Sequence, residues 1–148
     1  MPSLAANPAF VAYTVCMLVL ALNLLVIWAY SGAVRGKTKT TPNPEDAPAG
    51  RGTKVVDAEP PEVARVLRAH ANAMANIVPF AVLGLIFVLA GGSGTVANVL
   101  FGVFGAARVF HSFVYLAGKQ PWRSLAFGVG ALDTLVLMGF IVRALVAA

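Results

Sequence analysis

The sequence predicts an all-α integral membrane protein, built as one four-helix bundle, and three observations carry this prediction. The chain has 148 residues, of which 59% are hydrophobic and only 11% are charged, whereas a soluble domain carries about 25% charged residues. Four apolar stretches are each long enough for the roughly 20 residues that cross a bilayer. Their hydrophobicity does not alternate as in a barrel strand, which leaves the helix as the spanning structure. At this length, residues 1–148 form one domain.

The same composition excludes several classes of protein. So few charged residues are not expected in an ordinary soluble enzyme, a disordered tail or a nucleic-acid-binding domain. The net charge is +5, but the basic residues do not form one DNA-reading face, so no nucleic-acid partner is expected. Cys16 is the single cysteine and lies in an apolar run, which excludes a disulfide scaffold and a cysteine metal cluster. With two histidines in the chain, no metal site is predicted.

The predicted spans can be justified in order along the chain. They cover about residues 8–30, 61–90, 96–116 and 121–146. A cleavable signal peptide is the alternative for the first span, but residues 1–8 hold no Lys or Arg, which favours a retained anchor. Pro61 and Glu62 suit the start of the second helix, since proline and an acid are both favoured in a first turn. Pro121 starts the fourth helix in the same way, and Trp122 suits the membrane interface.

The loops predict the orientation in the membrane. The loop at about residues 31–60 is the stretch of soluble character, and its prolines argue against a long helix there. Five of the eleven basic residues lie in this loop: Arg35, Lys37, Lys39, Arg51 and Lys54. Lys119 and Arg123 lie between the last two spans, whereas the N-terminal tail and the loop at 91–95 have no basic residue. By the positive-inside rule, the first and third loops face the cytoplasm.

Small residues recur in the last two spans, where they let membrane helices approach closely. They are Gly102, Gly105, Ala106, Gly128, Gly130, Ala131 and Gly139. Their spacing is consistent with tight packing within one chain and equally with packing between subunits, so both interpretations stay open.

Polar side chains inside three of the spans are the strongest functional signal. They are Arg65, Arg68, Asn72 and Asn76 in the second span, Arg108, His111, Ser112 and Tyr115 in the third, and Arg123, Ser124 and Asp133 in the fourth. An arginine at mid-helix costs about 2.5–3.5 kcal/mol on insertion scales and therefore needs a polar partner or cavity. Spacings of three and four place the residues of each span on one helix face. We expect Arg108 and Asp133 to reach similar depths and to pair.

Each of these residues also has a simpler interpretation. Arg65, Arg68 and Arg123 lie near helix ends, where a side chain can extend to the headgroups. His70 lies off the polar face of its helix and suits helix packing. Arg108, in contrast, lies two turns from the end of its helix. The coincidence of polar groups on three helices at one level predicts an electropositive pocket for a polyanionic ligand, open to the cytoplasm.

These residues resemble the MAPEG family of membrane glutathione enzymes. The similarity lies in Arg68-Ala-His-Ala-Asn72 followed by Pro79, in Arg108-Val-Phe-His111 with Tyr115, and in Arg123-Ser124. The loop segment Asn43-Pro-Glu-Asp-Ala47 is similar to the branch of membrane-bound prostaglandin E synthases and microsomal glutathione transferases. The resemblance covers about residues 35–145. It implies a homotrimer of four-helix subunits, with glutathione bound between neighbouring subunits near the cytoplasmic side.

The resemblance also implies roles for individual residues. It implies that Arg123 and Ser124 act at the glutathione sulfur and that Asp46 assists proton transfer. The residues implied in glutathione binding are Arg35, Arg68, His70, Asn72, Arg108, His111 and Tyr115. The chemistry agrees, because arginines hold the two carboxylates of glutathione by charge-assisted hydrogen bonds and a nearby cation favours the nucleophilic thiolate. The second substrate would be a lipophilic electrophile that arrives from the membrane lipid.

Three functional hypotheses stay open from the sequence. The first is a glutathione-dependent transferase, isomerase or peroxidase. The second is a non-catalytic MAPEG-like binding or scaffolding subunit, because Ala71 and Ala75 stand where the family pattern has an arginine and an acid. The third is a small transporter or proton pathway that uses Arg108 and Asp133, although the chain lacks the inverted repeat typical of transporters.

Overall fold

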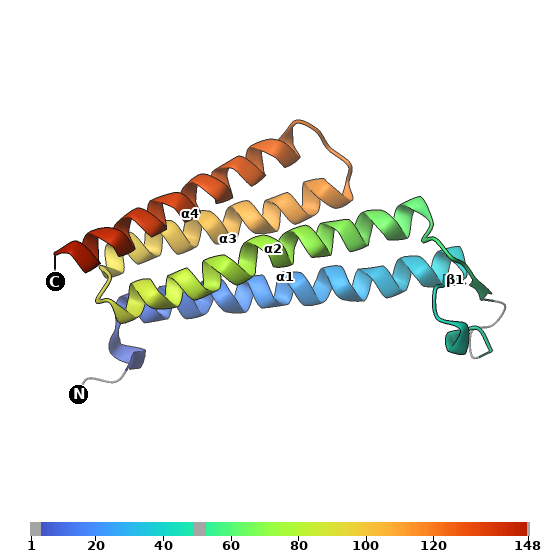
Figure 1. The fold of residues 1–148 in the computed structure, drawn as a ribbon, viewed down its shortest axis with the longest axis horizontal. Helices are drawn as coiled ribbons and strands as arrows, with labels where there is room; N and C mark the ends of the chain where they lie inside the picture. The colour runs from blue at the N-terminus through green and yellow to red at the C-terminus, as the bar shows by residue number, and fades with distance from the viewer. Residues whose placement is uncertain (1–3, 49–52, 148) are drawn as a thin grey trace.

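The computed structural model describes residues 4–48 and 53–147, and its long helices form an elongated bundle (Figure 1). These helices are α1 (Pro8–Thr38), α2 (Pro61–Leu89), α3 (Gly94–Leu116) and α4 (Trp122–Val146). Each is long and apolar enough to cross a membrane, which confirms the four predicted spans and makes this chain an integral membrane protein. Arg51, which the sequence analysis counted among the loop bases, lies outside the described residues.

Helix α1 is longer than the sequence predicted. It begins where the Asn7 side chain accepts a hydrogen bond from the Ala9 backbone N–H, at 2.9 Å, with Pro8 in the first turn. It then continues eight residues beyond the expected end at Tyr30, because the next helix-breaking proline is Pro42. The helix ends at Lys39, which adopts the left-handed conformation with φ 51°. The predicted loop of residues 31–60 therefore begins only after Thr38.

The segment between α1 and α2 is short and folds back on the helix ends. Strands β1 (Thr40–Thr41) and β2 (Lys54–Val55) pair in parallel, and the 3₁₀ turn η2 (Pro44–Asp46) lies between them. The Arg35 guanidinium forms an ion pair with Glu59, which links the end of α1 to the residues before α2. A second 3₁₀ turn, η1 (Leu4–Ala6), precedes α1.

Aromatic side chains hold the helices together in the half of the bundle away from this loop. Phe80 of α2 stacks on Phe104 of α3 with ring centroids 3.5 Å apart. Phe101 meets Phe80, Tyr13 and Phe87 edge to face. Helix α1 packs against α2 and α3, and α4 packs against α3. Large apolar side chains on the outer faces stay exposed, as expected for surfaces that contact lipid.

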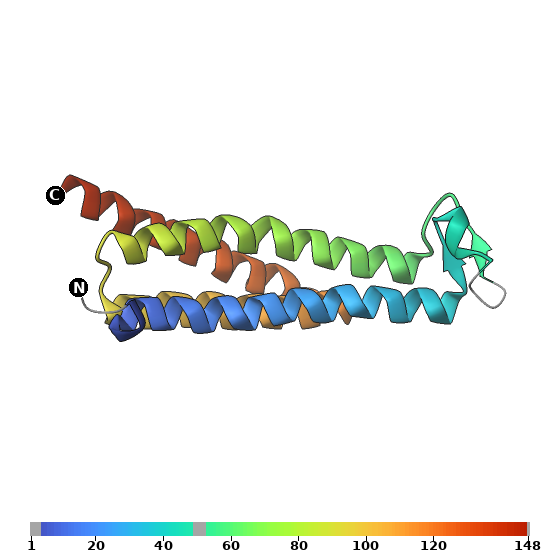
Figure 2. The ribbon, with the colours of Figure 1, turned by 90° about the horizontal axis from the view of Figure 1, so that it is seen from below.

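The two ends of the bundle differ. Both chain ends lie at one end, and the β1–β2 segment and the α3–α4 turn lie toward the other (Figures 1 and 2). At this second end, α1 and α2 extend beyond the ends of α3 and α4 in both views. The described basic residues of the first and third loops therefore lie toward the same end of the molecule.

The glycines of α3 and α4 divide into two groups. A Cβ on Gly130 would lie 3.4 Å from the Arg108 side chain, and one on Gly105 would lie 3.4 Å from the Cys16 sulfur. These two glycines serve packing within the chain. Around Gly102, Gly128 and Gly139 a Cβ would meet nothing within 4 Å, so these three lie on surfaces open to lipid or to another subunit.

Candidate functional site

A pocket of about 250 Å³ brings together polar residues from three helices. Asn72 of α2, His111 and Tyr115 of α3, and Arg123, Ser124 and Phe127 of α4 line it. The sequence analysis proposed five of these six residues as site residues, all except Phe127. It also predicted that three different helices would contribute them. The pocket lies toward the end of the bundle that carries the α3–α4 turn, because Arg123 and Ser124 open α4.

Arg108 lies behind this pocket and is completely buried. Its Nη2 group donates a hydrogen bond of 2.8 Å to the Asn72 side-chain oxygen and lies 3.3 Å from His111 Nδ1. A guanidinium can only donate. Nδ1 of His111 must therefore be the acceptor, and in the neutral ring the proton is then on Nε2. With its oxygen engaged, Asn72 offers its NH₂ group as a donor.

The groups that line the pocket are consequently able to donate hydrogen bonds to one ligand. The Arg123 guanidinium carbon lies 4.8 Å from the centroid of the Tyr115 ring, a cation–π contact that holds the guanidinium beside the pocket. The Ser124 hydroxyl donates its one proton to the Gln120 side chain at 3.1 Å, in an exposed hydrogen bond, so it donates to a ligand only after it turns away from Gln120. No acidic residue lines the pocket, and neither Arg108 nor Arg123 forms an ion pair with a described residue. Such an arrangement binds an anion, for example a carboxylate or a thiolate.

A chain of hydrogen bonds ties this arrangement to α1. The Asn23 side-chain NH₂ donates to Ser112 Oγ at 3.0 Å, and the Ser112 hydroxyl donates to the Arg108 backbone oxygen at 3.0 Å. Sequence reasoning missed Asn23 and the Ser124 partner Gln120. Asn23 could have been found, because it is a lone polar residue within an apolar span, whereas Gln120 carries no such signal.

The remaining residues proposed from the sequence do not line this pocket within one chain. Arg35 is engaged with Glu59, and the Arg68 side chain is exposed on α2. His70 is half-buried on the same helix. Asp46 lies in turn η2, where it accepts hydrogen bonds from the side chains of Asn43, at 2.9 Å, and Thr41, at 3.3 Å.

The expected pairing of Arg108 with Asp133 is wrong. The two side chains share neither a hydrogen bond nor an ion pair, and each keeps buried polar atoms without a partner among the described residues. Arg108 extends past Gly130 toward Asn72 and His111. Asp133 lies one turn further along α4 than Gly130, on the same buried face, and its Oδ2 atom has no hydrogen-bond partner among the described residues.

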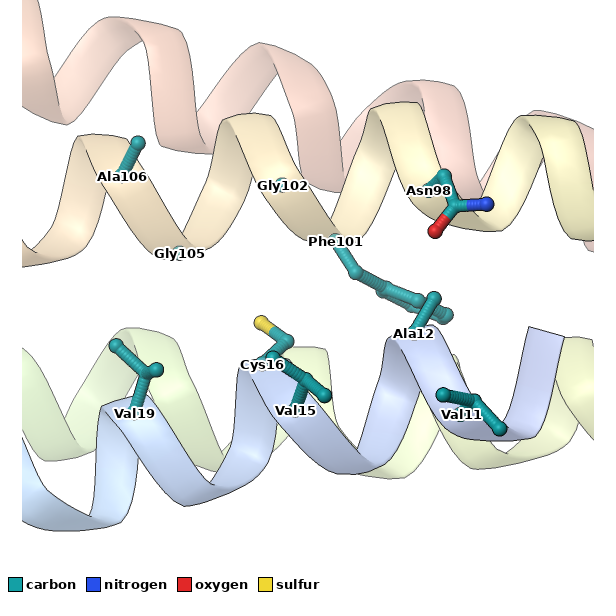
Figure 3. Close-up of a pocket in the computed structure, with 10 residues that line it drawn as sticks. All are labelled: Val11, Ala12, Val15, Cys16, Val19, Asn98, Phe101, Gly102, Gly105 and Ala106. Atoms are coloured by element: carbon teal, nitrogen blue, oxygen red, sulfur yellow. The ribbon is translucent and has the colours of Figure 1, made fainter. Parts of the chain in front are cut away.

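A second pocket, between α1 and α3, has a different character. Its volume is about 300 Å³, and it is lined mainly by small and aliphatic residues together with Phe101 and Asn98. In Figure 3 the Cys16 sulfur points from α1 toward Gly105 of α3. Cys16 is a free, buried thiol. No charged residue lines this pocket, so its ligands would be held mainly by apolar contact.

Comparison with known proteins agrees with the geometry of the site. Residues 13–143 match the MAPEG family. The chain is 35% identical over 128 residues to prostaglandin E synthase of Homo sapiens, across 86% of this chain and 84% of that protein. It is 37% identical over 134 residues to prostaglandin E synthase of Equus caballus, across 88% and 87%. It is 34% identical over 128 residues to microsomal glutathione S-transferase 1 of Rattus norvegicus, across 84% and 83%. The chain therefore belongs to the MAPEG family.

Proposed function

We propose that this protein is a glutathione-dependent membrane transferase or isomerase, or a peroxidase, that acts on lipophilic electrophiles. The observation that carries the proposal is the pocket of hydrogen-bond donors without an acidic residue, which has the Arg123 guanidinium at its edge. The relatives named prostaglandin E synthase and glutathione S-transferase, which match more than four fifths of the chain, support the same activity.

The chemistry follows from the charges of the site. Glutathione is the cosubstrate, and its carboxylates accept hydrogen bonds from the Asn72 and His111 side chains and from the arginines of the site. Its sulfur lies beside Arg123 and Ser124, where a cation and a hydroxyl donor stabilise the thiolate, the nucleophilic form. The thiolate then attacks an apolar electrophile that enters from the lipid. Proximity and orientation in the pocket supply a large part of the rate enhancement.

The complete site is assembled in a homotrimer, with glutathione between neighbouring subunits. A pocket of about 250 Å³ in one chain is smaller than the roughly 300–1,000 Å³ of typical ligand sites. Arg35, Arg68, His70 and Asp46 lie outside that pocket, and a neighbouring subunit can bring its copies of them to it. Membrane lipid surrounds the trimer. The segments after α1 and α3 face the cytoplasm, a proposal supported by their excess of basic residues.

The Arg123→Leu variant tests the proposal. We expect this variant to lose turnover of a generic electrophile such as 1-chloro-2,4-dinitrobenzene while it keeps part of its glutathione affinity, since other groups hold the carboxylates. The ultraviolet absorbance of the bound thiolate, titrated with pH, measures the activation of the sulfur directly. In the wild-type protein the thiolate should form at a lower pH than in free glutathione, and in Arg123→Leu at about the pH of the free thiol. Ser124→Ala should reduce turnover less than Arg123→Leu does, because the positive charge of Arg123 remains beside the sulfur.

The matched control is Arg143→Leu, which removes the same charge from the last turn of α4, at the opposite end of the helix. This control should leave turnover and the thiolate titration unchanged. If the wild type and Arg123→Leu titrate alike, near the value for free glutathione, Arg123 does not activate the sulfur. The non-catalytic binding subunit would then replace the enzyme as the proposed function.

A further inference from the structure

A cleft of about 520 Å³ lies away from the site described above, where α1 and α2 extend beyond the end of α3. The Tyr30, Val34, Lys37 and Thr38 side chains of α1 line one wall, and the first residues of α2, from Pro61 to Val66, line the other. Leu116, the last residue of α3, closes the cleft on the inside. Its lining is about equally polar and apolar, unlike that of the pocket in Figure 3.

Two cations without partners flank this cleft. Neither Lys37 nor Arg65 forms an ion pair or a side-chain hydrogen bond with any described residue. The Arg65 guanidinium lies against the α3–α4 turn, where a Cβ on Gly118 would be 2.6 Å from Nη1. Gly118 has φ +67°, a backbone conformation that favours glycine. One acid, Glu62, also lines the cleft.

The depth of the cleft matches the phosphate level of a bilayer. Tyr30 lies 22 residues after Pro8, about 33 Å along the helix at 1.5 Å per residue, which is slightly more than the roughly 30 Å of the hydrocarbon core. Lys37 lies a further seven residues along, or about 10 Å. Arg65 lies 24 residues before Leu89, about 36 Å from that end of α2. Measured from the opposite ends of their helices, Arg65 and Lys37 lie about 36 Å and about 44 Å along, within the roughly 40–45 Å that a bilayer spans with its headgroups. Both cations are thus at headgroup depth, while Val34, Val66 and Leu116 offer apolar contact.

We propose that this cleft is a binding site for one anionic phospholipid of the leaflet at this end of the bundle. Its phosphate lies between Lys37 and Arg65, and its glycerol and upper acyl carbons lie against the apolar residues of the cleft. Basic pockets between transmembrane helices on the cytoplasmic side are known to hold anionic headgroups. Because Arg65 rests on the α3–α4 turn, a bound phosphate links both helix extensions to the turn that precedes Arg123.

Native mass spectrometry of the detergent-solubilised protein tests the site, with dioleoyl-phosphatidylglycerol as the probe. We expect one tightly held molecule per chain, bound at least tenfold more tightly than dioleoyl-phosphatidylcholine with the same acyl chains. In the Lys37→Gln/Arg65→Gln variant this affinity should fall about fivefold for each removed cation, or about twenty-fivefold for both. Sodium phosphate at equal concentration should not displace the lipid, because it lacks the acyl chains; displacement would show a site for free phosphate instead.

The matched control is the Lys54→Gln/Lys119→Gln variant, which removes two cations at the same end of the molecule but outside the cleft lining. It should change the affinity less than threefold. Glu62→Gln removes the acid from the cleft and should tighten phosphatidylglycerol binding, so it tests the proposal even if the double variant does not fold. Equal binding of phosphatidylcholine, equal losses in the control, or an unchanged affinity in Glu62→Gln would each overturn the proposal.

Discussion

The Nη2 group of Arg108 determines which groups Asn72 and His111 present to the pocket that they line with Arg123 and Ser124, called here the anion pocket. It donates to the Asn72 oxygen and lies within hydrogen-bond distance of His111 Nδ1. Arg108 does not itself line the pocket. Because a guanidinium has no acceptor, it forces the amide and the imidazole to present their N–H groups to a ligand. Arg108 is therefore a positioning residue that acts through two neighbours.

Arg108→Gln should weaken glutathione binding much more than it slows chemistry. A glutamine can accept as well as donate, so Asn72 and His111 lose their enforced orientation. We expect KM for glutathione to rise about tenfold or more, since hydrogen bonds to charged groups contribute about 1.5–3 kcal/mol. The kcat at saturating glutathione should stay within about threefold of wild type. Steady-state kinetics checks this split, with Arg143→Gln as the control; a fall in kcat without a change in KM would contradict the positioning role.

Helix α4 shows how one element serves two environments. Its buried face consists of Ala126, Gly130, Asp133, Leu137 and Ile141, at the spacing of a helix that packs on one side. Arg123 and Ser124 precede this face in the first turn. Asp133 interrupts the apolar series and is only 7% exposed. Its Oδ2 atom has no hydrogen-bond partner among the described residues.

Asp133→Val should stabilise the folded protein, which is unusual for a change at a buried position. A buried polar atom without a partner costs about 1–3 kcal/mol, and valine removes that cost at similar volume. We expect the free energy of unfolding to rise by about this amount, with turnover unchanged because Asp133 does not line the pocket. Unfolding by sodium dodecyl sulfate, followed by circular dichroism, measures the change. Leu137→Val is the control and should destabilise by leaving a cavity; a destabilised Asp133→Val would mean that the carboxyl has an essential partner.

At the scale of the whole molecule, the position of the site residues supports the proposed homotrimer. Its anion pocket is small and open, and several residues proposed for glutathione binding lie on α1 and α2, outside that pocket. A Cβ on Gly102, Gly128 or Gly139 would meet nothing within 4 Å, so these positions have room for a neighbouring group. In a ring of identical subunits, a head-to-tail interface joins two different faces of each chain. A site formed at such an interface would combine Arg68 of one chain with Arg123 of the next.

Co-expression of two inactive variants tests this assembly. Arg68→Leu and Arg123→Leu should each be nearly inactive alone, because each removes one cation from every site. In a random 1:1 mixture, about a quarter of the interfaces combine an intact Arg68 with an intact Arg123. We therefore expect about a quarter of wild-type turnover from co-expressed chains and almost none from chains purified separately and then combined without exchange. No recovery on co-expression would contradict a site shared between subunits.

Much of this architecture can be predicted from the sequence, because only helices and closed barrels can cross a bilayer. The four long helices agree with the predicted bounds to within two residues at seven of eight ends, since a long apolar run favours a helix of that length. The exception is the end of α1, which continues for eight residues past its predicted apolar stretch, where apolar length is no guide. The polar faces of α2, α3 and α4 also identified five of the six residues that line the pocket.

Tertiary structure decided which of those residues meet. The positions of Arg108 and Asp133 in their spans predicted similar depths in the membrane and therefore a pair. Depth along a helix axis does not determine the direction in which a long side chain extends. The Arg108 side chain extends toward Asn72 and His111 instead. This contact and the hydrogen bond between Asn23 and Ser112 depend on how the four helices pack. The sequence by itself determined the membrane fold and the positive character of the site, because hydrophobicity and charge are properties of residues. Only the packed structure determined the polarity of the pocket and the Lys37–Arg65 cleft, because both arise from contacts between helices that are distant in the chain.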